Sequence, residues 1–337
     1  MPASSTSKAR KAAKPSAPKS ITRNYQDILY EVRDQVAWVT INRPRVLNAF
    51  REQTLDEMIA ALKSTREDPS IVCAVVTGAG DKSFSAGGDF FAMKRLNFTN
   101  AYMWNDRMLG LAMTIRGLPI PVIAMVNGWC MGGGHELALW CDLVIASENA
   151  VLGQTGARVG ACPTVGATQY IPRLIGERLA REMIFCARRF GAKEAVEVGL
   201  INKCVPQKDL LKETLKWCET MKGHSALTLR MTKKSLNFES DNLYSSWQHG
   251  MELLAHVWGS EEAKEGMNAF LAGRAPDFQK FRLRAKKELE QYVDGFERDL
   301  NAPPDMRRKK AKSRDTEDTE EELPGSNRQG RQARQEN

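Results

Sequence analysis

Short runs of β-branched residues alternate with helical patterns along this chain, and this alternation constrains the fold more than any other feature of the sequence. Ile28–Glu31 and Val36–Ile41 are predicted to form paired strands, and Val72–Thr77 and Pro121–Val126 are continuous apolar runs of the kind found in buried strands. Apolar residues spaced by about 3.6 positions predict a helix over Leu55–Ser64. Strands that alternate with helices imply a mostly parallel sheet, so we predict an α/β fold.

The later part of the chain changes from this alternation to helix. A helix is predicted over His135–Trp140 and a further strand over Leu143–Ala146, whereas the pattern from about residue 174 onward is almost wholly helical. One folded domain is therefore expected over residues 21–302. Its α/β core should span about 25–220 and its helical part about 221–300.

The two ends of the chain differ in composition from this body. Residues 1–20 are rich in Ser, Ala, Pro and Lys without an acidic residue, and residues 303–337 are polar with blocks of charge, so both are predicted to be disordered tails. A transit peptide is the alternative for the first tail. The net charge of +8 lies largely in the ends: residues 1–20 carry +5 and residues 301–337 carry +1, which leaves +2 for the 280 residues between them. A nucleic-acid partner is therefore not expected.

Composition also separates this chain from membrane and disulfide-rich proteins. A hydrophobic fraction of 42% is enough for a sizeable core, and no apolar run reaches the roughly 18 residues that a membrane-spanning helix needs. The seven cysteines show neither a CxxC motif nor a cluster with histidine. We therefore expect reduced thiols, no metal site and a cytoplasmic location.

Two glycine-rich turns are the main candidates for a functional site. Ser83–Asp89 follows one predicted strand, and Gly132–Leu137 follows the next and opens a helix. Consecutive glycines at a helix N-terminus leave backbone N–H groups uncovered where the helix dipole is positive, which favours an oxyanion. Neither turn fits GxxxxGK[ST] or GxGxxG, which argues against binding of nucleotide phosphates.

Taken together and in order, these turns and the phrases around them resemble the crotonase (enoyl-CoA hydratase/isomerase) superfamily. The resemblance runs from about Asp27 to Arg282. It implies a ββα spiral with a helical C-terminal region that forms homotrimers or homohexamers, and it implies an acyl-CoA substrate with no further cofactor. It rests on Ile41-Asn42-Arg43-Pro44, Asn48-Ala49, Thr77-Gly78-Ala79-Gly80, Phe84-Ser85-Ala86-Gly87-Gly88-Asp89, Asn127-Gly128, Gly132-Gly133-Gly134-His135-Glu136-Leu137 and Cys141-Asp142.

The resemblance also implies roles for individual residues. The N–H groups of Gly88 and Gly133 would form an oxyanion hole for the thioester carbonyl, and Glu136 would act as a general acid and base. Thr155 is a weaker candidate for positioning water. The remaining residues that the resemblance assigns would bind CoA: Arg45, Val46, Leu47 and Ala86 along its channel, with Phe278 and Lys280 closing on it from the C-terminal region.

The sequence departs from the plain hydratases at one position. Gly156 stands where they carry a second glutamate, within a Gly153–Gly156 phrase that resembles 1,4-dihydroxy-2-naphthoyl-CoA synthase and alicyclic oxoacyl-CoA ring hydrolases. The aspartate of the synthase falls at Pro163, which argues for the ring hydrolases. We expect the absent side chain to open room for a ring. His135 is expected to face away from the site.

The sequence therefore predicts an acyl-CoA hydratase or carbon–carbon hydrolase that acts on a cyclic or bulky acyl group. Two alternatives remain open at this point. One is a plain enoyl-CoA hydratase or isomerase that uses Glu136 alone. The other is a non-catalytic protein of the same fold that binds acyl-CoA or RNA.

Overall fold

The computed structural model describes residues 24–301. The two predicted tails, 1–20 and 303–337, lie outside this range, as do residues 21–23 and 302. The contacts divide the chain into two compact units, one that ends at Asp277 and one that begins at Phe278. The single domain predicted over 21–302 stays a prediction, and each unit is described by itself.

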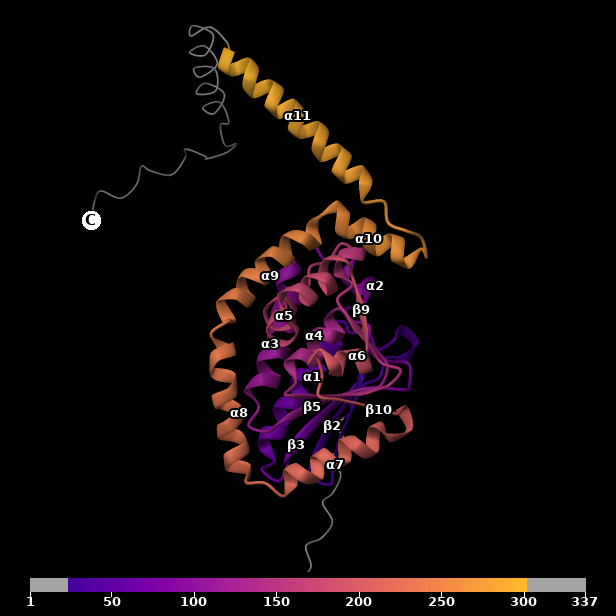
Figure 1. The fold of residues 1–337 in the computed structure, drawn as a ribbon, viewed down its shortest axis with the longest axis vertical. Coiled ribbons are helices and arrows are strands. Elements are labelled where there is room, and N and C mark those ends of the chain that lie inside the picture. Colours follow the sequence, from indigo (N-terminus) through magenta and orange to yellow (C-terminus); the bar gives the residue numbers. More distant parts are fainter. Residues whose placement is uncertain (1–23, 302–337) are drawn as a thin grey trace, which may run out of the picture. The chain divides into compact units, whose positions relative to one another are not determined.

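A six-stranded sheet forms the centre of the first unit (Figure 1). Its first two strands are antiparallel and join through a turn in which Asp34 and Gln35 have positive φ angles of 47° and 61°. The other neighbouring pairs are parallel. The strands follow the order β1 (Ile28–Arg33), β2 (Val36–Ile41), β3 (Cys73–Gly78), β5 (Val122–Val126), β7 (Leu143–Ser147) and β10 (Lys203–Val205).

A second sheet of four short strands lies beside the first and repeats its order. β3, β5 and β7 are each followed along the chain by one strand of the second sheet and then by helix, which is the predicted ββα spiral. Three of these strands pair in parallel, and the last pairs antiparallel. The strands are β4 (Ser83–Ser85), β6 (Trp129–Met131), β8 (Val151–Gly153) and β9 (Arg189–Gly191).

Both faces of the large sheet are buried at its central strands, which explains the continuous apolar strands of the sequence, whereas alternate residues of the edge strand β1 are exposed or half-buried. All six residues of β3 are buried. One face contributes to the main core, and the other packs against Leu210, Cys218 and Met221 of helix α7 (Leu210–Lys222) in a separate apolar cluster. The helices of the α/β part are α1 (Glu52–Ser64), α2 (Phe90–Met93), α3 (Ala101–Gly117), α4 (Gly133–Trp140), α5 (Ala167–Phe185) and α6 (Ala192–Glu197).

The predicted C-terminal helical region is confirmed. It consists of α7 (Leu210–Lys222), α8 (Ala226–Asp241), α9 (Tyr244–Gly259) and α10 (Glu261–Leu271), with α11 (Gln279–Asn301) in the second unit. Among the helices of residues 24–301, none combines the length and the apolar character that crossing a membrane requires.

Candidate active site

The first glycine-rich turn is held against the chain that precedes α1. Phe50 bridges the turn, because its N–H donates to the Gly87 carbonyl at 2.9 Å and its carbonyl accepts from Asp89 N–H at 2.8 Å. Gly87 has a φ of +93°, which favours glycine. Gly88 lies between the two bonded residues, so its own N–H points away from this ladder.

The second turn lies directly against the first. Gly132 has a φ of +53° and donates its N–H to the Gly153 carbonyl at 3.0 Å, which places Gly133 at the first position of α4. A Cβ atom on Gly87 would lie 2.9 Å from the Gly133 nitrogen, and one on Gly134 would lie 2.2 Å from the Ser85 carbonyl oxygen. Only glycines allow this approach. Within residues 24–301, neither Gly88 N–H nor Gly133 N–H donates to a protein acceptor.

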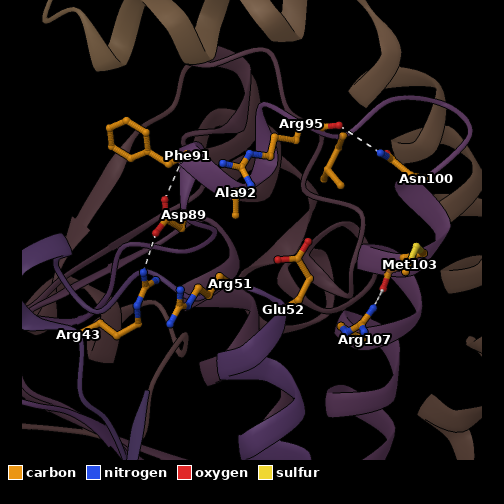
Figure 2. A pocket seen from close by; sticks show the side chains of 11 residues that line it. Arg43, Arg51, Glu52, Asp89, Phe91, Ala92, Arg95, Asn100, Met103 and Arg107 are labelled. Atoms are coloured by element: carbon orange, nitrogen blue, oxygen red, sulfur yellow. Dashed lines mark hydrogen bonds and ion pairs between the residues drawn. The ribbon is translucent and has the colours of Figure 1, made fainter. Parts of the chain in front are cut away.

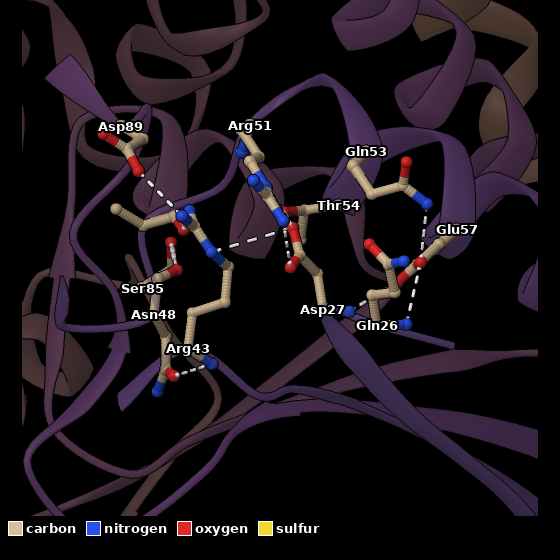
Figure 3. A network of polar contacts seen from close by, with 11 residues as sticks. Gln26, Asp27, Arg43, Asn48, Arg51, Gln53, Thr54, Glu57, Ser85 and Asp89 are labelled. Atoms are coloured by element: carbon tan, nitrogen blue, oxygen red, sulfur yellow. Dashed lines mark hydrogen bonds and ion pairs between the residues drawn. The ribbon is translucent and has the colours of Figure 1, made fainter. Parts of the chain in front are cut away.

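A buried charge network fixes the first turn from behind (Figure 3). Asp89, next to Gly88, pairs with Arg43 at 2.9 Å, and Arg43 lies 3.6 Å from Asp27. Asp27 also pairs with Arg51 at 2.8 Å. Burial opposes ionisation of Asp27, but its hydrogen bonds with Arg51 and Thr54 and the charge of Arg43 outweigh burial and hold the Asp27 pKa below its ordinary value. The Asn42-Arg43-Pro44 motif therefore serves to position the Gly88 peptide.

Asn48 joins the same turn to the end of β3. Its side-chain amide donates to the Ala79 carbonyl at 3.0 Å and to the Ser83 carbonyl at 2.7 Å, and its oxygen accepts from Arg43 N–H at 3.1 Å. These bonds explain why the sequence carries an asparagine at a fully buried position with a φ of +55°.

The two turns open into one small cavity of about 80 Å³. Five residues that the sequence analysis selected line it together: Ala86, Gly88, Gly133, Glu136 and Thr155. The other walls are mainly apolar or aromatic, so a thioester bound here would be shielded from water. These walls include Phe50, Phe90, Met93, Trp104, Met108, Val159, Val165, Leu254 and Trp258.

Glu136 is the one carboxylic acid among the residues that line this cavity. It lies one turn into α4, is 4% exposed, and accepts a hydrogen bond from Val165 N–H at 2.9 Å. Burial raises the pKa of Glu136 to about 8, against the opposing effect of the Val165 and Ala167 N–H groups. Its carboxyl group can therefore exchange a proton near neutral pH, as an acid–base catalyst requires.

Helix α4 also fixes the loop on the far side of the cavity. Trp140, one turn after Glu136, donates its indole N–H to the Val165 carbonyl at 2.9 Å. Both backbone groups of Val165 are thus bound by side chains of α4. Gly166 follows with a φ of +97°, and a Cβ atom there would lie 3.0 Å from the Trp140 indole nitrogen.

Sequence reasoning missed Gln154, which lines the cavity and is 1% exposed. Its side-chain nitrogen lies 3.3 Å from the Gly132 carbonyl oxygen and 3.4 Å from Nδ1 of His135. The Gly132 carbonyl belongs to the same peptide group as the Gly133 N–H. A hydrogen bond to that carbonyl orients the peptide and polarises its N–H. The adjacent Gly153–Gly156 phrase marked the segment, but nothing in the sequence showed this contact.

His135 faces away from the cavity, as expected, and lies behind it. Burial lowers the pKa of His135 to about 4, so the ring is neutral at physiological pH. A neutral ring with its proton on Nε2 accepts from Gln154 through Nδ1, which sets the orientation of the Gln154 amide.

The expectation that Gly156 opens room for a ring is wrong. A Cβ atom on Gly156 would lie 2.4 Å from the Ala161 carbonyl oxygen, and the Ala161 N–H donates to the Gly156 carbonyl at 2.9 Å. The backbone of the following loop therefore occupies the place into which a side chain would extend. A second carboxylate does not fit here without moving that loop.

The remaining candidates near the cavity are less suited to catalysis. Burial raises the pKa of the Cys162 thiol, which lines the cavity, and raises that of Cys130 well above its ordinary value. Neither thiol is therefore predisposed to act as a nucleophile. Thr155 lines the cavity and does not cap the short 3₁₀ helix Gly156–Arg158 that follows it.

The residues predicted to bind CoA lie in three places. Ala86 is in the cavity wall, and its N–H donates to the Leu47 carbonyl at 3.0 Å. This bond brings the 3₁₀ helix Pro44–Val46, which contains Arg45, next to the first turn. Val46 and Leu47 have exposed side chains and do not line the cavity. Phe278 and Lys280 belong to the second unit.

A larger cavity of about 600 Å³ contains none of the residues to which the resemblance assigns a catalytic or CoA-binding role (Figure 2). Its walls are charged, and several of the charges are already paired: Arg43 with Asp89, and Arg107 with Asp56 at 3.0 Å. Size alone would favour this cavity. The smaller one combines two uncommitted N–H donors with a buried carboxyl group, so we place the chemistry there. The other lining residues of the larger cavity include Arg51, Glu52, Phe91, Arg95, Asn100 and Met103.

Comparison with known proteins places this geometry in a family. The family model described as enoyl-CoA hydratase/isomerase matches residues 31–281. An enoyl-CoA hydratase from Mycobacterium avium subsp. paratuberculosis is 27% identical with a TM-score of 0.69, covering 76% of this chain and 99% of its own. An enoyl-CoA hydratase from Bacillus anthracis is 32% identical with a TM-score of 0.62, covering 75% and 99%. A carnitinyl-CoA hydratase from Mycobacterium avium is 30% identical with a TM-score of 0.68, covering 76% and 100%. With two adjoining glycine-rich turns on a ββα spiral and a family model that matches most of its length, the chain belongs to the enoyl-CoA hydratase/isomerase family.

Proposed function

We propose that this protein adds water to an enoyl-CoA thioester and uses Glu136 as its only acid–base carboxyl group. One observation carries the proposal: Glu136 is the sole carboxylic acid in the cavity wall, and the Ala161 carbonyl occupies the space that a second carboxylate at position 156 would need. The protein is then an enzyme whose CoA arrives with the substrate.

The geometry suggests how one carboxyl group performs both proton transfers. The thioester oxygen accepts hydrogen bonds from Gly88 and Gly133 N–H. As the oxygen of water bonds to the β-carbon, an electron pair moves onto the thioester oxygen and forms an enolate, which the two donors stabilise. Ionised Glu136 removes the proton from that water and, now neutral, delivers it to the α-carbon. The product is the β-hydroxyacyl thioester, and Glu136 is ionised again.

The acyl group that we propose is cyclic or bulky, and the support comes from the walls of the cavity. Phe50 and Trp104 stack with ring centroids 6.2 Å apart, and Phe90 and Trp258 add further aromatic surface. Flat walls of this kind suit a flat ring. The resemblance of the Gly153–Gly156 phrase to ring-handling relatives agrees with this choice, and with ring opening after hydration as a further step.

A second candidate is a plain hydratase for short linear enoyl groups. The specific observation in its favour is the cavity volume of about 80 Å³, which is small for a ring. The names of the similar structures, two enoyl-CoA hydratases and a carnitinyl-CoA hydratase, agree equally with this candidate.

A substrate panel distinguishes these candidates. We would compare kcat/KM for crotonyl-CoA, cyclohexene-carbonyl-CoA, cyclohexadiene-carbonyl-CoA and 6-oxocyclohexene-carbonyl-CoA, with hydrated and ring-opened products followed by mass spectrometry. A preference for the cyclic thioesters supports our proposal. A much higher kcat/KM for crotonyl-CoA would contradict the cyclic substrate and support the plain hydratase. Binding of all four without turnover would refute enzymatic function and support a non-catalytic acyl-CoA-binding protein.

The binding of CoA and the assembly are proposed on the family resemblance. Arg45, Val46 and Leu47 would lie along the CoA channel with Ala86, and Phe278 and Lys280 would close on CoA. The assembly would be a homotrimer or homohexamer. The position of residues 45–47 next to the Ala86 turn supports the first of these assignments.

A further inference from the structure

Helix α11 lies almost entirely beyond the part of the chain that the family model matches. The match ends at residue 281, whereas α11 spans Gln279–Asn301. A helix of 23 residues is about 35 Å long at 1.5 Å per residue. A helix of this length needs a partner for any apolar face that it carries, because most helical stability in proteins comes from packing.

An apolar stripe runs along α11. At 100° per residue, Ala285, Leu289, Tyr292 and Phe296 fall within about 60° of one another. Leu289 is 62% exposed, Tyr292 is 70% exposed and Phe296 is 56% exposed. The spacing of four, three and four residues is that of a coiled-coil seam. Tyr292 and Phe296 stack along the stripe with centroids 6.5 Å apart.

Charge is divided between the two halves of the same helix. Residues 279–287 contain five basic side chains and no acidic one, and residues 288–296 contain three acidic side chains and no basic one. A parallel partner of the same sequence would set like charges side by side. An antiparallel partner would set the basic half of each helix against the acidic half of the other. The residues are Lys280, Arg282, Arg284, Lys286, Lys287, then Glu288, Glu290 and Asp294.

We propose that two copies of this chain associate through their α11 helices, packed antiparallel about a two-fold axis between positions 290 and 291. In that register Ala285 of one copy faces Phe296 of the other, and Leu289 faces Tyr292. Each contact occurs twice, as a two-fold interface requires. The small Ala285 leaves room for the large Phe296, which lets the layers interdigitate.

Cysteine pairs test the register in the full-length protein. The background is Cys186→Ser, because Cys186 is exposed. The double variant Ala285→Cys/Phe296→Cys should form a covalent dimer under mild oxidation, seen on a non-reducing gel and lost on reduction. The two positions in one helix are about 16 Å apart, too far for a bond within one chain. Neither single variant should form the dimer.

The outcomes separate this arrangement from others. A dimer from Ala285→Cys alone would show parallel pairing and overturn the proposal. The absence of any dimer from the double variant would also overturn the proposal, because α11 would then pack against some other surface.

A second measurement does not depend on disulfide geometry. Leu289→Glu should lower the molar mass measured by light scattering at least twofold relative to wild type. Leu283→Glu is the matched control, because Leu283 is 58% exposed and lies about 140° around the helix from Phe296. Equal masses for the wild type and the Leu289→Glu variant would also overturn the proposal.

Discussion

Replacement of Glu136 by glutamine tests the central assignment most directly. The amide retains the shape of the carboxyl group and an oxygen that can accept from Val165 N–H, so the loop at Val165 should remain in place. The amide cannot take up or release a proton. We therefore expect substrate affinity to persist while kcat falls by about 10²- to 10⁴-fold, the usual contribution of a general acid or base.

The raised pKa of Glu136 also predicts how the free energy of unfolding depends on pH. Burial raises that pKa from 4.5 to about 8, and one unit corresponds to 1.36 kcal/mol, so ionising Glu136 in the folded protein costs about 5 kcal/mol as an upper estimate. The folded state holds its proton more tightly than the unfolded state. The stability of wild type relative to Glu136→Gln is therefore greatest below pH 4.5 and is lost as the pH rises through about 8.

Two assays test the expected pH dependence, one of the rate and one of the stability. The kcat/KM of wild type should rise with pH and level off above about pH 8, because the ionised carboxylate removes the proton from water. Urea unfolding of both proteins between pH 5 and pH 9 should show wild type losing stability relative to the variant. Glu57→Gln is a control, since Glu57 is also buried but lies outside the cavity. A pH-independent difference in stability would refute the raised pKa, and a rate loss below tenfold would make Glu136 structural.

Three further substitutions test the parts around Glu136. Gly133→Ala keeps the backbone N–H but places a Cβ atom 2.7 Å from Cζ of Phe50, so the donor peptide must shift and activity should fall about 10²- to 10³-fold. Gly133→Ala with Phe50→Leu relieves that contact and should restore both the melting temperature and most of the rate; recovery of the melting temperature without the rate would contradict this. Gln154→Leu removes the bond to the Gly132 carbonyl, and we expect kcat to fall about tenfold in steady-state assays with KM little changed. Gly156→Glu should lower the melting temperature and add no hydratase activity, because its Cβ atom meets the Ala161 carbonyl oxygen; a gain in crotonyl-CoA turnover would contradict this.

The sequence predicted what depends on local backbone chemistry. The two glycine-rich turns were recognised because positive φ angles and close backbone approach leave few residue choices, and Gly87 and Gly132 show both properties. The predicted strands were confirmed with small shifts at their ends, because buried parallel strands have an unmistakable apolar run. Glu136 was selected through the family resemblance of the Gly132–Leu137 phrase, and the structure adds its burial and its raised pKa.

The parts that the sequence did not predict depend on contacts between distant segments. Gln154 reaches the Gly132 carbonyl only because β8 pairs with β6, and no local pattern encodes that pairing. The error at Gly156 has the same origin. An absent side chain suggests space, but Ala161, five residues later, returns its carbonyl to that place.

Helix α4 supplies most of the geometry of the proposed site by itself. Gly133 N–H is at its first position, Glu136 lies one turn further, and Trp140 lies one turn beyond that with Val165 held between the last two. The proposed oxyanion donor, the proposed acid–base group and the wall opposite are thus fixed by a single rigid element, so a change in one would displace the others. The choice of acyl group is therefore left to parts outside α4, namely α2, α3, α9 and the loop over residues 156–163, and substitutions that alter substrate preference without loss of rate should be found there.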